Sequence, residues 1–491
     1  MSVQLSLRNV ATFGNVAAED DAVLKYFLTT DAVARVSSGE ILLALGRKGS
    51  GKTALVRHFT ESDSVMTARS VTLRAYPWAT HQKRADQSTS EVEAYVASWR
   101  YLIVVQLASL LMAHDDVDHA TSEAKSIREF FSVNYGGLDP DLVDVLRPDK
   151  LQLSKASFEP MVLGNKLGAI SLERGGSNAG RELGALTDAL LNAVITLGGA
   201  CGIQGLFLHF DELDQGLTTL DETRKNMLIG LILAARAILR STAKMPMSCV
   251  PVVYLRTDLW EDLKFSDKNK ITQTQALSLE WNHSTLLELV NERLTANLSS
   301  DATWEQVTGQ DLMRGSQTKW DHILARTFLR PRDVIQFLNI ALSKAKLRQD
   351  SPLIFANEDV ADAREAYSTY LKRELDDEII PHWEQWEDAL RACSAIATVT
   401  FQKEQFTDKY NKLISSGNSI PADEALQMMY RFSVIGYQRP TSGGGSQWIF
   451  HYQNPSAGWD THANRFKVHI GLKEFAKLRE ERLAAAGGAT S

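Results

Sequence analysis

The stretch that decides the fold is Gly46-Arg47-Lys48-Gly49-Ser50-Gly51-Lys52-Thr53. It follows a short apolar run at 41–45 and precedes a segment of helical periodicity at 52–60. It matches the pattern G-x-x-x-x-G-K-S/T in full, in the strand–loop–helix context that this pattern requires. Its glycines let backbone N–H groups converge on phosphate oxygens, which also face the positive end of the following helix. The stretch therefore predicts a phosphate-binding loop, in which Lys52 contacts the β- and γ-phosphates and Thr53 offers a hydroxyl ligand to Mg²⁺.

A second apolar run, 205–210, ends in Asp211-Glu212. In open α/β sheets ligands bind at the carboxyl ends of the strands, so two carboxylates here are well placed for nucleotide chemistry. We expect Asp211 to hold the Mg²⁺ shell and Glu212 to polarise the attacking water as general base. The alternative is a solvated acidic turn. His209 interrupts the run and is expected to be a buried, hydrogen-bonded structural residue.

A third apolar run, 250–255, ends in Arg256. In ATPases of this plan a strand lies between the phosphate-loop strand and the acidic strand and ends in a polar sensor. Arg256 is therefore predicted to contact the γ-phosphate during catalysis. The alternative is a surface arginine at the end of a strand.

Two further arginines flank a proline in Arg330-Pro331-Arg332-Asp333. Proline is tolerated in the first turn of a helix, so the motif predicts a helix start here. Positive charge at a helix start is unfavourable unless an anion is near. Arg330 and Arg332 are therefore predicted to be lid residues that contact the nucleotide, and the alternative is an ion pair with Asp333 or a neighbouring acid.

Alternation of buried strands with helices predicts an α/β fold with a parallel sheet. The resemblance described below implies that this is a P-loop NTPase core (ASCE/AAA+-like) with a helical lid and a C-terminal winged helix. A helix is expected at 16–30, and strand character within the insertion at 151–171. The predicted division is 1–113 for an N-terminal helix and the first half of the core, 114–180 for an insertion, 181–280 for the second half of the core, 281–380 for the lid, 381–483 for the winged helix and 484–491 for a disordered tail.

The C-terminal region predicts helices followed by a hairpin, with strands at 434–437 and 447–452 around a Gly/Pro/Ser-rich loop. The segment where a recognition helix is expected, 422–432, carries Asp423 and Glu424. Only Gln427 and Arg431 could contact base edges. This pattern favours a regulatory or protein-docking role over DNA reading.

Bulk composition argues against several other classes of protein. Net charge is −7, which argues against broad charge-driven binding to nucleic acid. Residues 1–9 lack a basic segment followed by an apolar run, so we expect no signal peptide. The longest apolar stretch is expected near 227–239 and is too short and too charged to span a bilayer, so we expect no direct membrane role. The widely spaced Cys201, Cys249 and Cys393 predict no zinc site and fit a cytoplasmic protein with reduced thiols.

The order of these motifs resembles that of ATPases around the AAA+ and STAND proteins, including origin-recognition-type ATPases. It is most similar to bacterial signalling-type P-loop ATPases found among conflict and phage-defence genes. The resemblance covers most of the chain except 114–180. It rests on the phosphate loop and on Phe13-Gly14 with Ala18-Glu19, Tyr254-Leu255-Arg256-Thr257-Asp258, Trp281, Arg330-Pro331-Arg332-Asp333 and Val468-His469.

The resemblance implies a switch driven by ATP and Mg²⁺, acting as a homo-oligomer or with an effector protein in bacterial defence. In STAND-like members an arginine at the end of the sensor strand matches Arg256. Arg240 is a weak candidate for an arginine finger. The alternative is a nucleic-acid-associated ATPase of the origin-recognition or transposition-regulator type, and a slow nucleotide-binding scaffold is a third, which the intact Glu212 opposes.

Overall fold

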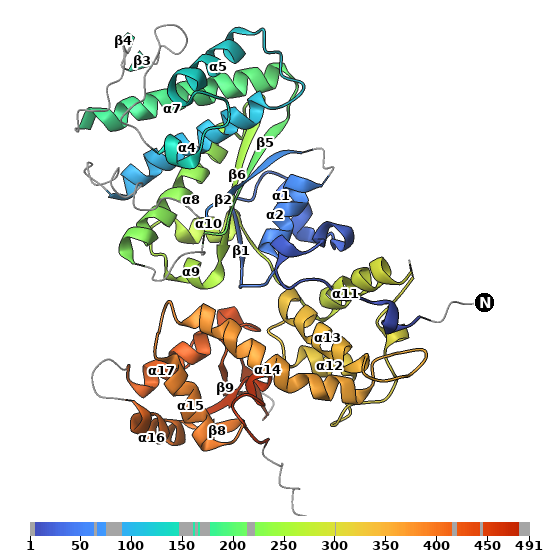
Figure 1. Ribbon diagram of the computed structural model, residues 1–491. Coiled ribbons are helices and arrows are strands. Elements are labelled where there is room, and N and C mark those ends of the chain that lie inside the picture. Colours follow the sequence, from blue (N-terminus) through green and yellow to red (C-terminus); the bar gives the residue numbers. More distant parts are fainter. Residues whose placement is uncertain are drawn as a thin grey trace, which may run out of the picture. The chain divides into compact units, whose positions relative to one another are not determined.

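The computed structural model describes residues 5–62, 66–74, 91–146, 161–162, 165–166, 177–213, 221–299, 301–414, 420–441 and 445–480, with backbone alone at 161–182. Contacts divide the chain into two compact units (Figure 1). Thr29–Glu280 form the core unit, and Met1–Leu28 together with Trp281–Ser491 form the C-terminal unit. The first 28 residues therefore belong with the C-terminal unit, which corrects their expected place in the ATPase core.

The core unit is built on a five-stranded, all-parallel sheet in the order β2-β5-β6-β1-β7. Its strands are β1 (Leu43–Gly46), β2 (Thr67–Thr72), β5 (Gly205–Asp211), β6 (Ser248–Arg256) and β7 (Ala276–Ser278). The central strands β1, β5 and β6 are buried almost throughout, as continuous apolar runs in parallel sheets are. The predicted strand β6 lies between the phosphate-loop strand β1 and the acidic strand β5, and this prediction is confirmed.

Helices cover this sheet, and α4 packs against α7, α8 and β5. The helices of the unit are α1 (Asp31–Ser37), α2 (Lys52–Glu61), α4 (Glu91–Met112), α5 (Ser122–Tyr135), α6 (Leu142–Val145), α7 (Ser177–Ala200), α8 (Glu222–Thr242), α9 (Thr257–Asp262) and α10 (Lys268–Thr274). The expected insertion holds α5, α6 and a short hairpin of β3 (Met161–Val162) and β4 (Asn165–Lys166).

Among the described residues, two helices are long and apolar enough to cross a membrane: Glu91–Met112 and Leu183–Ala200. The expectation that the longest apolar stretch lies at 227–239 is therefore wrong. In the first helix 83% of the apolar window is buried inside the protein, and in the second 50% is buried. A helix that is apolar all round is the pattern of a buried core helix, so these two segments are weak evidence for a membrane span.

The C-terminal unit begins with an N-terminal segment that is packed on the lid helices. The helix expected at 16–30 is replaced by 3-10 turns, and the described turns of the unit are η1 (Leu7–Asn9), η2 (Ala18–Asp20), η3 (Val23–Tyr26), η5 (Glu305–Val307), η6 (Pro455–Ala457) and η7 (Ile470–Leu472). Arg293, 4% exposed, donates to the Phe13 carbonyl and pairs with Asp21 at 3.2 Å. Gly14, at φ +102°, leaves no room beside Arg293 for a Cβ atom. These tertiary contacts, which periodicity does not encode, fix the segment in its non-helical form.

The lid is all-helical, as predicted, with α11 (His283–Asn297), α12 (Lys319–Leu324), α13 (Pro331–Ala345) and α14 (Asn357–Ile379). Asn282 caps α11 with its side chain. Pro331 occupies the first turn of α13, which confirms the predicted helix start.

Three further helices and a four-stranded antiparallel sheet, in the order β10-β9-β11-β8, complete the unit. Strands β9 and β10 form the predicted hairpin. The elements are α15 (Trp386–Ile396), β8 (Thr400–Gln402), α16 (Lys403–Leu413), α17 (Ala422–Arg431), β9 (Ile435–Pro440), β10 (Ser446–Ile449) and β11 (Arg465–Val468). The tail predicted at 484–491 lies outside the described residues.

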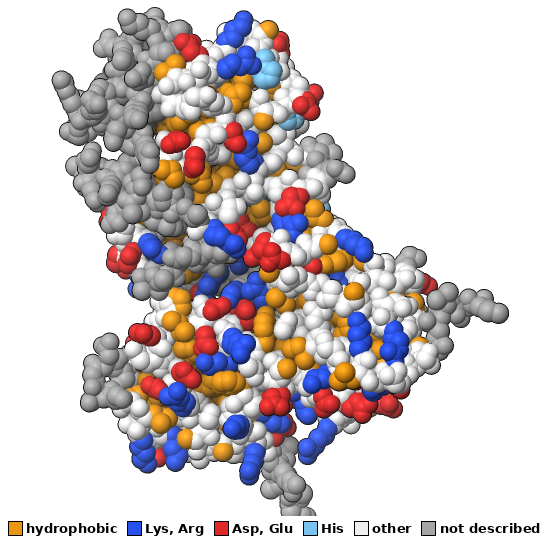
Figure 2. Space-filling view, in the orientation of Figure 1, with side chains coloured by type: hydrophobic (Ala, Val, Ile, Leu, Met, Phe, Trp, Pro, Cys, Tyr) orange, Lys and Arg blue, Asp and Glu red, His pale blue; other side chains and the backbone are white. Residues whose placement is uncertain are grey.

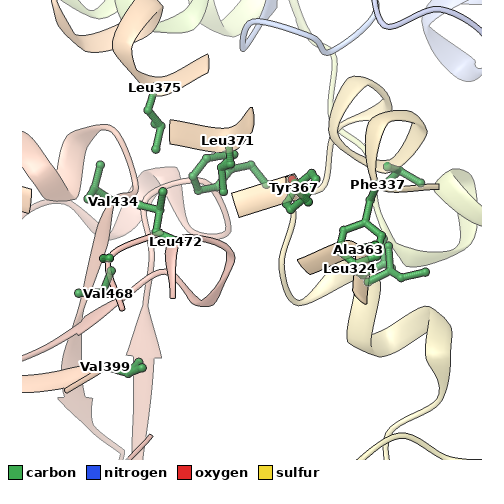
Figure 3. Close-up of a cluster of buried hydrophobic side chains, with 14 of the residues drawn as sticks. Leu324, Phe337, Ala363, Tyr367, Leu371, Leu375, Val399, Val434, Val468 and Leu472 are labelled. Atoms are coloured by element: carbon green, nitrogen blue, oxygen red, sulfur yellow. The ribbon is translucent and has the colours of Figure 1, made fainter. Parts of the chain in front are cut away.

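Helix α14 joins the lid to this small sheet through one continuous core. Figure 3 shows Tyr367, Leu371 and Leu375 along α14, with lid side chains to one side and side chains of the small sheet to the other. All three are fully buried. Their spacing of four residues puts them on one face of the helix. The lid and the C-terminal sheet therefore share a hydrophobic core rather than forming separate ones.

We expect Leu371→Ala to destabilise the C-terminal unit by about 2–5 kcal/mol, because it opens a cavity in this shared core. Seven of the ten tryptophans lie in this unit, so urea unfolding followed by tryptophan fluorescence reports mainly on it. Leu347→Ala, at a side chain that is 77% exposed, is the control and should change stability by less than about 0.5 kcal/mol. Equal effects of the two variants would show that the shared core is not the source of stability.

Candidate active site at the carboxyl edge of the core sheet

The phosphate loop has the backbone shape that its sequence predicts. Gly49 and Gly51 adopt φ values of 79° and 96°, a region that favours glycine. A Cβ on Gly46 would lie 2.2 Å from the Ser50 hydroxyl oxygen, so only glycine fits where the loop closes on itself. Gly51 caps α2, whose first N–H groups therefore open toward the loop. The loop can accept a phosphate chain at the positive end of this helix.

Lys52 is held by the loop itself. Its ammonium donates to the carbonyl oxygens of Gly46, at 3.0 Å, and Arg47, at 3.2 Å. These hydrogen bonds hold the Lys52 ammonium within the phosphate loop. A bound nucleotide would replace neutral acceptors with phosphate oxygens, and charge-assisted hydrogen bonds are about twice as strong as neutral ones.

Asp211 and Glu212 lie where β5 ends, as predicted. Asp211 is 5% exposed and is the last residue of the strand. Glu212 follows at φ 59°, a left-handed conformation that costs a non-glycine residue about 1–2 kcal/mol. Strained backbone of this kind clusters at functional sites, where surrounding contacts maintain it.

One such contact is an ion pair that the sequence did not indicate. Arg74, just beyond β2, approaches the Glu212 carboxylate with a nitrogen–oxygen distance of 3.1 Å. The β2–β5 register pairs Thr72 with Asp211, which brings the residues after both strands together. Arg74 is 54% exposed at its side chain and Glu212 only 12%. The predicted general base is thus held by a surface arginine from the neighbouring strand, and only strand pairing reveals this.

His209 is a structural residue, as predicted. Its ring stacks on Phe59 with centroids 5.2 Å apart, and its Nδ1 is 2.9 Å from the Tyr254 hydroxyl. Burial lowers the pKa of His209 to about 3, so the ring is neutral at physiological pH. Burial and, less strongly, the charge of Asp211 raise the pKa of Tyr254, so its hydroxyl stays protonated. This neutral pair anchors β5 and β6 behind the acidic residues.

Arg256 lies beside the phosphate loop, since the β1–β6 register pairs it with Gly46. It is 7% exposed and makes a two-pronged ion pair with Asp258, at 3.0 Å from Nε and 2.7 Å from a terminal nitrogen. The alternative of a surface arginine is therefore excluded. The sequence did not single out Asp258 as the partner, although it lies two residues along the chain.

Arg330 and Arg332 behave differently from each other. Arg330, 2% exposed, pairs with Asp333 at 2.8 Å and with Glu378 at the end of α14 at 2.5 Å. Burial alone would lower the pKa of Arg330, but the two carboxylates raise it well above its ordinary value, so it stays charged. Arg332 is more exposed, at 20% of its side chain, and contacts Glu374 and the Val16 carbonyl at 3.2 and 3.1 Å. The ion pair with Asp333, which the sequence left as the alternative, is the role that the structure gives to Arg330.

The residues at the sheet edge suit Mg²⁺ by their chemistry. Thr53 supplies a hydroxyl oxygen at the start of α2 and Asp211 a carboxylate oxygen at the end of β5. Oxygen ligands of this kind, few in number and completed by phosphate oxygens and water, are what Mg²⁺ uses in ATPases. Among the described residues, no group of three or more His, Cys, Asp or Glu side chains lies close enough together to hold a metal ion.

Together the sheet order and this edge define the class of the protein. A phosphate loop follows β1, an Asp-Glu pair ends β5, and an arginine ends the strand between them. The chain has the fold and the phosphate-loop site of a P-loop NTPase of AAA+-like plan.

Comparison with known proteins adds one family model and several distant structural likenesses. A model described as the FunZ-associated C-terminal helical domain matches residues 284–376, which make up most of the lid. No curated protein matches the chain.

Among solved structures, the chain is similar to a Walker-type ATPase of Pyrococcus abyssi, with 11% identity, a TM-score of 0.36, and coverage of 87% of this chain and 94% of that one. It is also similar to the ORC2 protein of Aeropyrum pernix in ADPNP–ADP complexes, with 13% identity, a TM-score of 0.38, and coverage of 88% and 89%. A third is Cdc6p of Pyrobaculum aerophilum, with 10% identity, a TM-score of 0.29, and coverage of 93% and 96%.

Removing the arginine that holds Glu212 is expected to raise basal activity. In Arg74→Ala the carboxylate is free to turn toward a water, and the lost ion pair, being half exposed, is worth at most about 1 kcal/mol. Steady-state ATP hydrolysis should therefore rise about two- to fivefold. Arg57→Ala is the control, because it removes an arginine whose ion pair is with Glu61 within α2. A marked fall in kcat for Arg74→Ala would instead show that Arg74 assists the reaction directly.

Proposed function

We propose that ATP hydrolysis by this chain depends on Mg²⁺ and drives a conformational or oligomeric switch. The observation that carries this proposal is that the loop, both carboxylates and Arg256 meet at one edge of the sheet, where three of the charged groups are held by partners within the chain. Lys52 is held by loop carbonyls, Glu212 by Arg74 and Arg256 by Asp258. Nucleotide binding would therefore replace these contacts within the chain by contacts to the nucleotide and its attacking water.

The roles of the residues follow from their positions. Lys52 would move to the β- and γ-phosphates, and Thr53 and Asp211 would hold Mg²⁺, which supplies charge neutralisation of the phosphates when it is bound. Glu212 would leave Arg74 and accept a proton from the attacking water. Arg256 would leave Asp258 and turn to the γ-phosphate. Lys52 would exchange neutral carbonyl acceptors for phosphate oxygens, Glu212 would exchange an arginine for a water, and Arg256 would exchange one anionic partner for another.

In the lid, Arg332 supports a nucleotide-sensing role better than Arg330 does. Arg330 is buried between two carboxylates, and removing it from them would leave uncompensated charges at a cost of about 3–5 kcal/mol. Arg332 is partly exposed and has one carboxylate partner, Glu374, on α14. If Arg332 exchanges Glu374 for a phosphate, the contact between α13 and α14 changes with nucleotide state, and α14 carries that change into the shared core.

The first test measures ATP hydrolysis and assembly size together for the wild type, Lys52→Ala and Glu212→Gln, with and without Mg²⁺. We expect Lys52→Ala to lose nucleotide binding, and Glu212→Gln to bind ATP but hydrolyse it about 10²–10⁴-fold more slowly. Light scattering should show that ATP changes the assembly of the wild type and that Glu212→Gln stays in the ATP-bound form. Hydrolysis without any change in conformation or assembly would contradict the switch.

We further propose that the switch acts on an effector protein in bacterial defence. This finer proposal is supported only by the resemblance of the sequence motifs to ATPases found among conflict and phage-defence genes. Expression of the chain with its neighbouring genes should lower phage plating by about tenfold or more, and Lys52→Ala should remove that protection. Protection that survives Lys52→Ala, or none against a broad phage panel, would count against it.

A nucleic-acid-associated ATPase is the second candidate, because the C-terminal helices and hairpin follow the order of a winged helix. Figure 2 shows basic and acidic side chains interspersed on the face in view, rather than a broad basic coat. On this face, any nucleic-acid contact would therefore be local. Stimulation of hydrolysis by DNA or RNA, with a steep dependence on salt, would favour this candidate over the first.

A further inference from the structure

The small C-terminal sheet has two unlike faces. Cross-strand neighbours on one face are Phe401, Phe466, Tyr437 and Ile449, which are all buried. Side chains alternate between faces along a strand, so the residues between them lie on the opposite face. We call that opposite side the outer face.

The outer face carries an aromatic ring and two cations. Trp448 is opposite Gln438 on β9, Arg465 is opposite Gln402 on β8, and Lys467 lies between Gly436 and Thr400. Trp448, Arg465 and Lys467 are all half-buried. None of the four described strands contains Asp or Glu. The ring of Phe450 covers Gly436 and the Thr400 hydroxyl oxygen is buried, so Lys467 lies at the covered end of the face. The more accessible part runs from Trp448 through Gln438 and Arg465 to Gln402.

Charge is divided within this region of the sequence. Residues 425–480 hold seven Lys and Arg against three Asp and Glu. Residues 384–424, which contain the helices before the sheet, hold four Lys and Arg against seven Asp and Glu. In the expected recognition helix α17, Asp423 is paired with Lys403 from α16. The four strands carry Arg439, Arg465 and Lys467 and no Asp or Glu, so the sheet is electropositive. Helix α17 carries Asp423, Glu424 and Arg431, a net charge of −1.

Lys467 and Trp448 form a contact that suits a polyanion with flat rings. The Lys467 ammonium lies 5.7 Å from the centre of the Trp448 ring. Burial lowers the pKa of Lys467, and Glu480 opposes this effect. Glu480 itself is bonded to Lys473. An anion near Lys467 would therefore favour its charged form.

A plain solvated face is the alternative explanation, since antiparallel sheets often have one polar side. Such faces usually mix both signs of charge, because opposite charges across strands are stabilising. Here Trp448 on β10 and two cations on β11 share one face of a sheet whose four strands carry no carboxylate. This combination is the one that single-stranded nucleic-acid platforms use, with rings that stack on bases and cations that follow the phosphates.

We propose that the outer face of the β10-β9-β11-β8 sheet binds single-stranded nucleic acid, with Trp448 stacking on a base and Arg465 and Lys467 contacting phosphates. Duplex DNA presents its bases inside the stack, so it gains little from Trp448. This binding goes beyond the proposed switch and does not require nucleotide.

The test is fluorescence anisotropy of the full-length protein with labelled 20-nucleotide oligo(dT), its RNA counterpart and a duplex, at several salt concentrations and without ATP. We expect the paired change Arg465→Glu with Lys467→Glu to weaken single-strand binding at least tenfold and to reduce the salt slope by about 1.4, since each phosphate contact on single strands contributes about 0.7. Trp448→Leu keeps apolar volume but loses stacking, and should weaken binding about fivefold or more.

The matched control is Arg391→Glu with Lys412→Glu, the same charge change at exposed positions on the helices α15 and α16. Normal thermal unfolding and normal ATP hydrolysis of each variant show that it is folded. Lys52→Ala should bind the oligonucleotide as the wild type does, which separates this inference from the proposed function.

Three results would overturn the proposal: no binding at about 50 mM salt, equal losses in the control, or tighter binding to the duplex with no effect of Trp448→Leu. Displacement of the oligonucleotide by poly-glutamate at the same charge concentration would also overturn it, because the face would then be a docking site for an acidic polypeptide.

Discussion

Strand β1 runs parallel to β6, and their register sets Gly46 beside Arg256. Strand β5 runs parallel on the other side of β6, so its terminal Asp211 reaches the same edge. This convergence is a property of parallel sheets, in which all carboxyl ends meet at one edge. Without the crossover that inserts β6 between β1 and β5, the loop, the acids and the arginine would not share a site. The helices and the insertion around the sheet maintain this arrangement.

The groups at this edge are already paired. A lysine bonds to loop carbonyls, a glutamate to an arginine of the neighbouring strand, and an arginine to an aspartate two residues away. Charges brought out of water are tolerated in proteins when they are compensated in this way. The same pairing gives the site a resting state, because each functional group must exchange a partner before it can act. Exchange of these ion pairs is therefore a simple way to regulate the site.

The C-terminal unit couples its parts through packing and buried charge. Tyr367, Leu371 and Leu375 bring the lid and the small sheet into one core along α14. Arg330 connects the start of α13 to the end of the same helix through Glu378. The N-terminal segment joins this unit through Arg293 and Asp21. Because packed cores do not deform continuously, a change at α13 would be transmitted to the small sheet rather than absorbed in the lid.

The sequence by itself determined the elements whose signals are local. The glycine pattern at 46–53, the apolar runs that end in Asp211 and Arg256, the proline at the start of α13 and the hairpin of β9 and β10 each depend on residues close together in the chain. The α/β class and the positions of these residues at the ends of the strands could therefore be predicted, and their roles in catalysis stay predictions. Alternation of side chains along the strands of the C-terminal sheet is also a local property. Which of the two faces is buried depends on the tertiary structure.

Only the tertiary structure decided which side chains form ion pairs with one another. Arg74 meets Glu212 because β2 pairs with β5, although the two residues are far apart in sequence. Arg330 and Arg332 have nearly the same local sequence context, yet burial beside Glu378 separates their roles. The expected helix at 16–30 gave way to turns because Asp21 and Gly14 fit around Arg293, a residue of another helix. Pairing of distant segments sets burial and charge compensation, and these depend on the fold as a whole rather than on any single stretch of residues.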